Sequence, residues 1–285
     1  MARRISRPLA LRVTWLIAPW GVSAHAATLL AWITAVAAAA AFGAGTHVGW
    51  ICGAALLQFW YLLDHVDGQL ARYHGTASLD GVQLDYLMHH TVNLLVPLGI
   101  GYGLCVHSDK PAWLIVSCTW AVASLLLGLQ HDCRYKAFTQ RLKRVRGELR
   151  LIGGGGARPT PAARPPMRIL KSSAWLVRKA CEIHVVMNVL AMLALAQWLS
   201  GDERLYFARC YVCVMALLAS VSAVVTIWRS TRDQLAETEF ALWYQPPAGR
   251  ELVFADGWWW VLAATETEAM SADADAEERA GTYLC

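Results

Sequence analysis

Long apolar runs alternate with short polar turns along most of the chain. The runs fall at residues 24–42, 48–72, 82–106, 112–130, 184–199 and 205–228. A helix needs about 20 predominantly apolar residues to cross a bilayer, so runs of this kind are typical of membrane spans. The pattern predicts an all-α integral membrane protein with about six transmembrane helices.

The residues before the first run show a different pattern, in which basic residues are set among apolar ones. The basic residues are Arg3, Arg4, Arg7 and Arg12. They are spread too widely for the charged region of a cleaved signal peptide, and Pro19 separates them from the first run. Residues 1–23 are therefore predicted to form an amphipathic segment at the membrane interface.

Composition supports the membrane class. Hydrophobic residues make up 56% of the 285 residues and charged residues only 16%, whereas a soluble domain has about 25% charged residues. The eight cysteines are scattered, and only Cys210 and Cys213 form a CxxC pair. A zinc site needs a second pair, so we expect thiols buried in the membrane.

Basic residues indicate which turns face the cytoplasm. The N-terminal segment, a basic segment at 131–180 and the end of the last run fall on one side, whereas the opposite turns contain only Lys110 and Arg204. By the positive-inside rule, both termini and the stretch 64–89 face the cytoplasm. We expect a multi-pass protein of the cell inner (cytoplasmic) membrane.

Three regions follow from these patterns. Residues 1–23 form the interfacial segment, 24–232 the six-helix domain, and 233–285 an acidic, partly disordered cytoplasmic tail. Within the six-helix domain, 131–180 is a basic cytoplasmic loop whose Gly/Pro-rich centre is typical of a flexible linker. Three tryptophans at 258–260 are candidates for anchoring the tail at the membrane interface.

The stretch 64–89 places charged residues where two predicted spans meet. Asp64 and Asp67 are three residues apart, and Asp85 and His89 are four apart, so each pair lies on one helical face. If the two spans form an antiparallel pair, these faces converge. Because a carboxylate near the bilayer core costs roughly 2.5–3.5 kcal/mol, such a group indicates a functional site. The alternative is that these are helix-end charges solvated by the interface.

Carboxylates held about 4 Å apart repel by roughly 4 kcal/mol at an effective dielectric constant of 20, so a cluster of them requires cations. Oxygen ligands suit Mg²⁺ or Mn²⁺, which in turn bind phosphate oxygens. Gly68, Ala71 and Gly81 leave space beside the cluster, and Arg72 offers a planar donor for phosphate. These residues predict a phosphorylated substrate approached from the cytoplasm.

The stretch has the pattern D-x2-D-G-x2-A-R-x8-G-x3-D-x3-H. It resembles the signature of the CDP-alcohol phosphotransferase (CDP-alcohol phosphatidyltransferase, class I) family, and it matches seven of the eight named positions at the correct spacing. The predicted topology is similar as well. The resemblance implies transfer of a phosphatidyl or other substituted phosphate group from a CDP-linked donor, often CDP-diacylglycerol, to an alcohol, with release of CMP.

The resemblance also implies roles for the motif residues. Two divalent metal ions, Mg²⁺ or Mn²⁺, would be held by Asp64, Asp67 and Asp85. The cytidine and pyrophosphate pocket would be shaped by Gly68, Ala71, Arg72 and Gly81. Similar proteins are homodimers, and no nucleic acid is implied as a partner.

His89 departs from the family pattern. The family has there a fourth Asp, which is a metal-site residue and the proposed general base. Imidazole can serve as a base or as a metal ligand, but it removes one negative charge, which weakens the case for a tightly held second Mg²⁺. Three interpretations remain: His89 is the base or a ligand, the site is degenerate and binds CDP-lipid or metal without turnover, or the donor or reaction has changed.

The acceptor is not indicated by the motif. Arg134 and Lys136, at the end of the fourth span, are candidates for binding a phosphorylated acceptor, although positive-inside charge explains them equally well. A transporter or channel is disfavoured because the charges cluster at one membrane face. A prenyltransferase would need a second Asp-rich motif, which is missing.

Overall fold

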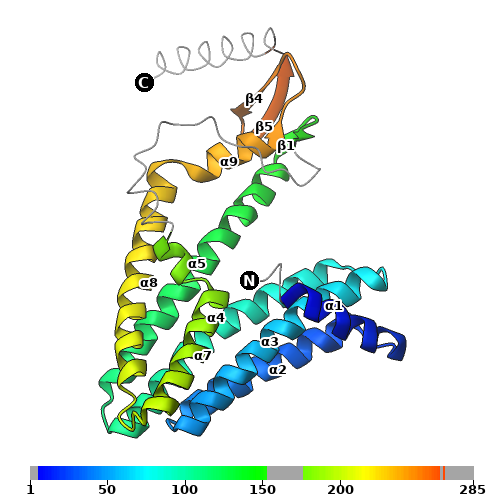
Figure 1. The fold of residues 1–285 in the computed structure, drawn as a ribbon. Helices are drawn as coiled ribbons and strands as arrows, with labels where there is room; N and C mark the ends of the chain where they lie inside the picture. Colours follow the sequence, from blue (N-terminus) through cyan, green and yellow to red (C-terminus); the bar gives the residue numbers. More distant parts are fainter. Residues whose placement is uncertain (1–5, 153–175, 264–265, 267–285) are drawn as a thin grey trace, which may run out of the picture. The chain divides into compact units, whose positions relative to one another are not determined.

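The computed structural model describes residues 6–152, 176–263 and 266. The chain divides into two compact units, and most of the helices belong to the first, which comprises Met1–Leu129 and Met167–Thr226. The helices, labelled in Figure 1, are α1 (Ser6–Ile17), α2 (Ala24–Gly43), α3 (His47–Tyr73), α4 (Leu79–Ser108), α5 (Ala112–Leu142), α7 (Ile183–Ser200) and α8 (Tyr206–Arg232). The prediction of a helical membrane fold is confirmed, although a small part of the chain forms β-strands.

Each predicted span corresponds to one helix. Within the described residues, five helices are long and apolar enough to cross a membrane, namely α2, α4, α5, α7 and α8. The second predicted span, α3, is not among them because Asp64, Asp67 and Arg72 make its last turns polar. Its 27 residues extend about 40 Å at 1.5 Å per residue. The C-terminal end of α3 lines the same cavity as the N-terminal ends of α2 and α4, so α3 runs antiparallel to both.

The N-terminal segment forms α1 and then a short 3₁₀ turn, Ala18–Trp20, that contains Pro19. One face of α1 packs against α3 of the same unit, where Ala10 forms a small buried cluster with Val66 and Leu70. The opposite face exposes apolar side chains, and Trp15 is 79% exposed. This two-faced helix has the character expected of an interfacial segment.

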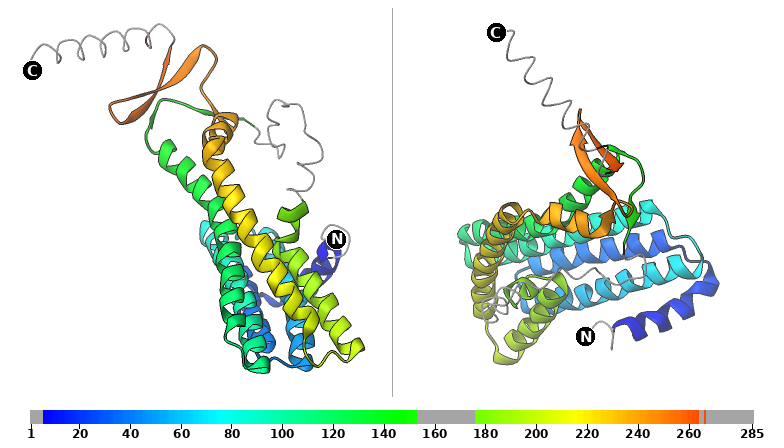
Figure 2. Two further views of the ribbon diagram at one scale, coloured as in Figure 1. Left: turned by 90° about the vertical axis from the view of Figure 1, so that its left-hand side faces the viewer. Right: turned by 90° about the horizontal axis from the view of Figure 1, so that it is seen from above.

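The helices α2, α3 and α4 lie side by side, as the view from above in Figure 2 shows in blue to cyan. Alanines and glycines make this close approach possible. A Cβ atom placed on Gly99 would lie 2.2 Å from the carbonyl oxygen of Ala39, and one on Gly103 would lie 2.2 Å from that of Phe42. The spacing of these glycines is the small-xxx-small pattern of tightly packed membrane helices.

The second unit comprises Gln130–Pro166 and Ile227–Cys285. Its described elements are the end of α5, β1 (Val145–Arg146), β2 (Arg150–Leu151), α9 (Leu235–Trp243), β3 (Tyr244–Gln245), β4 (Arg250–Ala255) and β5 (Trp258–Ala263). In one sheet, β5 pairs antiparallel with β4 and parallel with β1; β2 and β3 form a second, antiparallel pair. Asp256 and Gly257, both with positive φ, form the tight hairpin turn for which Asp-Gly is typical.

Arginines and aromatic rings hold this second unit together. Arg141 forms an ion pair with Glu237, and its guanidinium lies 4.2 Å from the ring centre of Trp259. Arg146 lies 3.8 Å from the ring centre of Trp258. These two tryptophans, which we had considered as membrane anchors, therefore contact arginines of their own unit.

The structure changes the sequence-based view of the loop and the tail. The first part of the basic loop is not a flexible linker, because α5 continues as a helix to Leu142. The tail 233–285, expected to be acidic and partly disordered, contains α9 and the β4–β5 hairpin. Most of the Gly/Pro-rich centre and the final acidic residues lie outside the described residues.

The packing of α2 on α4 gives a first prediction. We expect Gly99→Ala to lower the melting temperature of the detergent-solubilised protein by several degrees, because overpacking costs about 1–3 kcal/mol. Gly43→Ala is the matched control, since its Cβ atom would lie 3.5 Å from Tyr102 Cδ1, an ordinary contact. Equal melting temperatures for the two variants would contradict this account of the packing.

Candidate functional site

One cavity of about 450 Å³ lies in the first unit and is enclosed by α2, α3, α4 and the turn between α3 and α4. All eight motif positions line it. They are Asp64, Asp67, Gly68, Ala71, Arg72, Gly81, Asp85 and His89. The convergence of the two helical faces that we expected from the spacing is therefore present in the structure.

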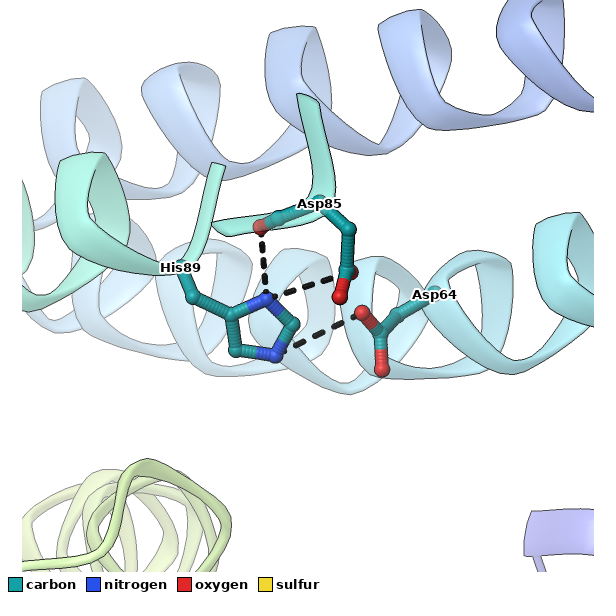
Figure 3. A group of neighbouring side chains, drawn as sticks. All are labelled: Asp64, Asp85 and His89. Carbon is teal, nitrogen blue, oxygen red and sulfur yellow. Dashed lines mark hydrogen bonds and ion pairs between the residues drawn. The ribbon is translucent and has the colours of Figure 1, made fainter. Parts of the chain in front are cut away.

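Three of the four predicted metal ligands come together at one end of this cavity. Asp64, Asp85 and His89 each offer one ligand atom, and these atoms lie within 4.8 Å of one another. Figure 3 shows the imidazole of His89 between the two carboxylates, with Nε2 3.5 Å from Asp64 Oδ1 and Nδ1 3.3 Å from Asp85 Oδ1. The site joins the last turns of α3 to the first turns of α4.

The surroundings of His89 fix which ring nitrogen is available. Nδ1 lies 2.9 Å from the backbone carbonyl oxygen of Asp85, which can only accept a hydrogen bond. In the neutral imidazole Nδ1 therefore carries the proton, and the lone pair is on Nε2, which is directed toward Asp64. The ring of Trp60 packs against the imidazole at a centroid distance of 5.5 Å and holds its orientation. His65 Nδ1 lies 3.4 Å from the other oxygen of Asp64.

Asp67 lines the cavity but does not join the group of three. Its side chain is 8% exposed, and its Oδ2 atom accepts a hydrogen bond of 2.7 Å from the hydroxyl of Thr28 on α2. Thr28 also lines the cavity. Sequence analysis missed this residue because it lies 39 positions before Asp67 and has no place in the motif.

The remaining motif residues shape the cavity wall. The guanidinium of Arg72 lies over Gly68, so that a Cβ atom there would be 3.4 Å from Arg72 Nη1. Gly81 is in the first turn of α4, and its N–H donates a hydrogen bond to the hydroxyl oxygen of the N-cap residue Ser78. Small residues at 68 and 81 leave the space open between Arg72 and the start of α4.

The donor set fits a divalent cation. Two carboxylates and an imidazole lie close enough together to act on one ion, and Asp67 keeps one carboxylate oxygen without a hydrogen bond to Thr28. Carboxylate oxygens suit Mg²⁺ and Mn²⁺, and imidazole is a ligand of transition metals. The set therefore suits Mn²⁺ at least as well as Mg²⁺. A nitrogen ligand that donates its other N–H to a backbone carbonyl is the usual arrangement for a metal-bound histidine.

The two basic residues proposed for the acceptor do not line the cavity. Arg134 forms an ion pair with Glu239, with 2.8 Å between Nη1 and Oε2, and its side chain is 11% exposed. This arginine is therefore engaged in the packing of the second unit. Lys136, two residues later, is exposed.

Comparison with known proteins agrees with the motif. Residues 20–143 match the sequence profile of the family described as CDP-alcohol phosphatidyltransferase, which confirms the resemblance. The fold is similar to that of phosphatidylinositol phosphate synthase from Mycobacterium tuberculosis with CDP-DAG bound, at a TM-score of 0.50 and 18% identity over 79% of this chain and 94% of that chain. The same synthase in complex with manganese and citrate gives 0.49 and 18%, over 79% and 89%. No curated protein matches the sequence.

The contact between Thr28 and Asp67 gives a second prediction. Partners of metal ligands typically contribute 10–100-fold to metal affinity, so we expect Thr28→Val to weaken Mn²⁺ binding about tenfold or more and Thr28→Ser to preserve it. Titration calorimetry on the detergent-solubilised protein measures this. Thr34→Val is the control, because its buried hydroxyl bonds Leu30 O on the same helix, away from the cavity. Equal affinities for the two valine variants would show that Thr28 does not support the site.

Proposed function

We propose that the protein is a metal-dependent transferase of phospholipid synthesis, because residues 20–143 match the CDP-alcohol phosphatidyltransferase family. It moves a phosphatidyl, or another substituted phosphate, from a CDP-linked donor to an alcohol and releases CMP. CDP-diacylglycerol is the donor that the cavity and its membrane setting fit best. The observation that carries this proposal is that all eight motif positions line one cavity and three of its polar side chains converge.

The two ends of the cavity suit the two parts of this reaction. Asp64, Asp67 and Asp85 would hold Mg²⁺ or Mn²⁺, in a two-metal arrangement as the family signature implies. His89 would be a further ligand only in the alternative in which it is not the base, because its neutral ring has one free lone pair. Bound metal would neutralise charge on the donor phosphates as the leaving group departs. Arg72 would bind a phosphate oxygen, and the glycines at 68 and 81 leave room for the nucleotide.

His89 is the residue that we propose as the general base. Its Nε2 atom carries the lone pair in the neutral ring and faces the cavity, while its Nδ1–H is held by Asp85. As the acceptor hydroxyl oxygen bonds to the lipid-bearing phosphorus, the bond from that phosphorus to the CMP oxygen breaks, and the hydroxyl proton passes to Nε2. An imidazole is a suitable base for this transfer near neutral pH.

The membrane arrangement is part of the same proposal. Both termini and the cavity face the cytoplasm in a multi-pass protein of the inner membrane, because the basic segments flank this side of the spans. There the cavity can take a lipid-linked donor from the bilayer and a water-soluble alcohol from the cytoplasm. A homodimer is the expected assembly, by similarity to the family.

A third prediction tests the reaction. We expect the purified protein with Mg²⁺ or Mn²⁺ to release CMP from CDP-diacylglycerol when it is given the correct alcohol, and EDTA to abolish release. His89→Ala should lower the rate at least about 10²-fold, the usual contribution of a positioned base. His89→Asp should retain part of the activity because a carboxylate can take either role. An acceptor screen with mass spectrometry of the lipid product measures these rates.

His90→Ala is the control for His89. The two residues are adjacent, but the ring of His90 faces Gly128 of α5 and does not line the cavity. Full activity of His89→Ala would remove His89 from the mechanism. Metal-dependent binding of CDP-lipid without CMP release across a broad acceptor panel would instead favour a member of the family that binds without turnover.

A further inference from the structure

A second, much smaller cavity lies inside the first unit, where α4, α5 and the start of α7 meet. Its volume is about 10 Å³. Most of its wall is apolar, but it is also lined by Asn93 of α4, Ser124 of α5 and Cys181, two residues before α7. This cavity is separate from the one that contains the motif, because the two have no lining residue in common.

A proline interrupts the hydrogen bonding of α4 beside this small cavity. Pro97 lies inside the helix and lines the cavity. Proline has no N–H, so the carbonyl oxygen of Asn93, four residues earlier, lacks its regular helical donor. Inside a membrane bundle such a carbonyl group takes its hydrogen bond from a neighbouring side chain or from an ordered water molecule. The break therefore creates a backbone acceptor at a residue that lines the cavity.

Two polar side chains around the cavity also lack partners. Within the part of the chain that the structure describes, neither the amide of Asn93 nor the hydroxyl of Ser124 forms a hydrogen bond, although Ser124 is only 8% exposed. Thr119, also on α5, instead donates to the carbonyl oxygen of Ile115 in the preceding turn. Burying an amide or a hydroxyl without a partner is costly, so these groups indicate a ligand that satisfies them.

The size and the lining of the cavity favour water as this ligand. A cavity of about 10–15 Å³ holds one water molecule, and that water needs roughly two to four polar partners. None of the residues that the structure places around the cavity is charged, so an ion would be left without a counter-charge. A carbonyl oxygen, a side-chain amide and a hydroxyl together offer both acceptors and donors to one water molecule.

We propose that this cavity binds one water molecule, which donates a hydrogen bond to the carbonyl oxygen of Asn93 and forms another with the hydroxyl of Ser124. The water replaces the helical hydrogen bond that Pro97 removes, and it joins α4 to α5. Its place is between the part of α4 that carries the motif residues and the part that packs on α2 through Gly99 and Gly103. The water site is independent of the proposed transferase activity.

A double-mutant cycle measured by melting temperature tests this bridge in the full-length protein in detergent. Ser124→Ala removes one partner of the water, and we expect it to lower the melting temperature by about 2–4 °C. Pro97→Ala supplies an N–H to the carbonyl oxygen of Asn93. In the Pro97→Ala background, Ser124→Ala should therefore lower the melting temperature by less than about half as much, because the carbonyl no longer needs the water.

Ser117→Ala is the matched control. Ser117 is a fully buried serine of the same helix, but it lies against Gly101 and does not line the small cavity. Its substitution should change the melting temperature equally with Pro97 and with Ala at position 97. Additive effects of Ser124→Ala and Pro97→Ala would overturn the bridge, because two groups that share one water molecule cannot act independently.

A crystal or cryo-EM structure that resolves ordered water gives a direct test, which does not depend on the folding of Pro97→Ala. We expect density for one water within hydrogen-bond distance of the Asn93 carbonyl oxygen and of Ser124 Oγ in the wild-type protein. Ser124→Val, whose methyl groups fill the cavity, should lack this density. A dry cavity in the wild-type map, or a direct hydrogen bond between Ser124 and Asn93, would overturn the water site. The CMP-release assay is unaffected by either result, so the proposed transferase activity is tested separately.

Discussion

The site depends on holding three carboxylates close together at the ends of membrane helices. Such groups repel one another, and each needs a donor or a cation nearby. The structure supplies a different neighbour to each: Asp67 accepts from Thr28, Asp64 lies between the imidazoles of His65 and His89, and Asp85 holds His89. The contact of Thr28 with Asp67 requires α2 to lie directly against α3. The contacts of Asp64, Asp85 and His89 instead require α3 and α4 to converge.

At position 89 this chain has His where the family pattern has Asp. The difference keeps the geometry of the site but changes its charge. With neutral imidazole in place of a carboxylate, the cluster carries one negative charge less. The ring is nevertheless held on two sides, by the carbonyl oxygen of Asp85 and by the ring of Trp60. These two contacts hold the ring in one orientation. The reduced charge bears on how strongly a second metal ion is bound.

The second unit uses its basic residues differently from what a charge count suggests. Arg134 and Arg141 form ion pairs with Glu239 and Glu237, and Arg141 also stacks on Trp259. Cation–π contacts of this kind are worth about 0.5–2 kcal/mol, so they contribute to the stability of a small sheet with a limited core. These basic side chains therefore have a role in the local structure of the second unit.

The sequence by itself determined the helices and half of the site. Predicted spans begin and end close to the observed helices, from Ala24 at the start of α2 to Trp228 near the end of α8, because the length of an apolar run is set by the bilayer. The exception is α5, which continues past the apolar run to Leu142. The spacing within 64–89 placed Asp64, Asp85 and His89 on converging faces because helical periodicity is local. The hairpin turn at Asp256–Gly257 also has a local signal, because an Asp-Gly pair favours a two-residue turn.

Only the tertiary structure decided the rest of the site. Thr28 and His25 reach the cavity from α2, and the pairing of Arg134 with Glu239 joins positions more than 100 residues apart. Contacts of this kind depend on how helices pack, and no periodicity in the chain records them. The orientation of His89 combines both kinds of contact: the carbonyl oxygen of Asp85 lies four residues earlier in the same helix, whereas the ring of Trp60 comes from α3. Sequence spacing could bring the imidazole to the site, but the ring that packs against it came only from the tertiary structure.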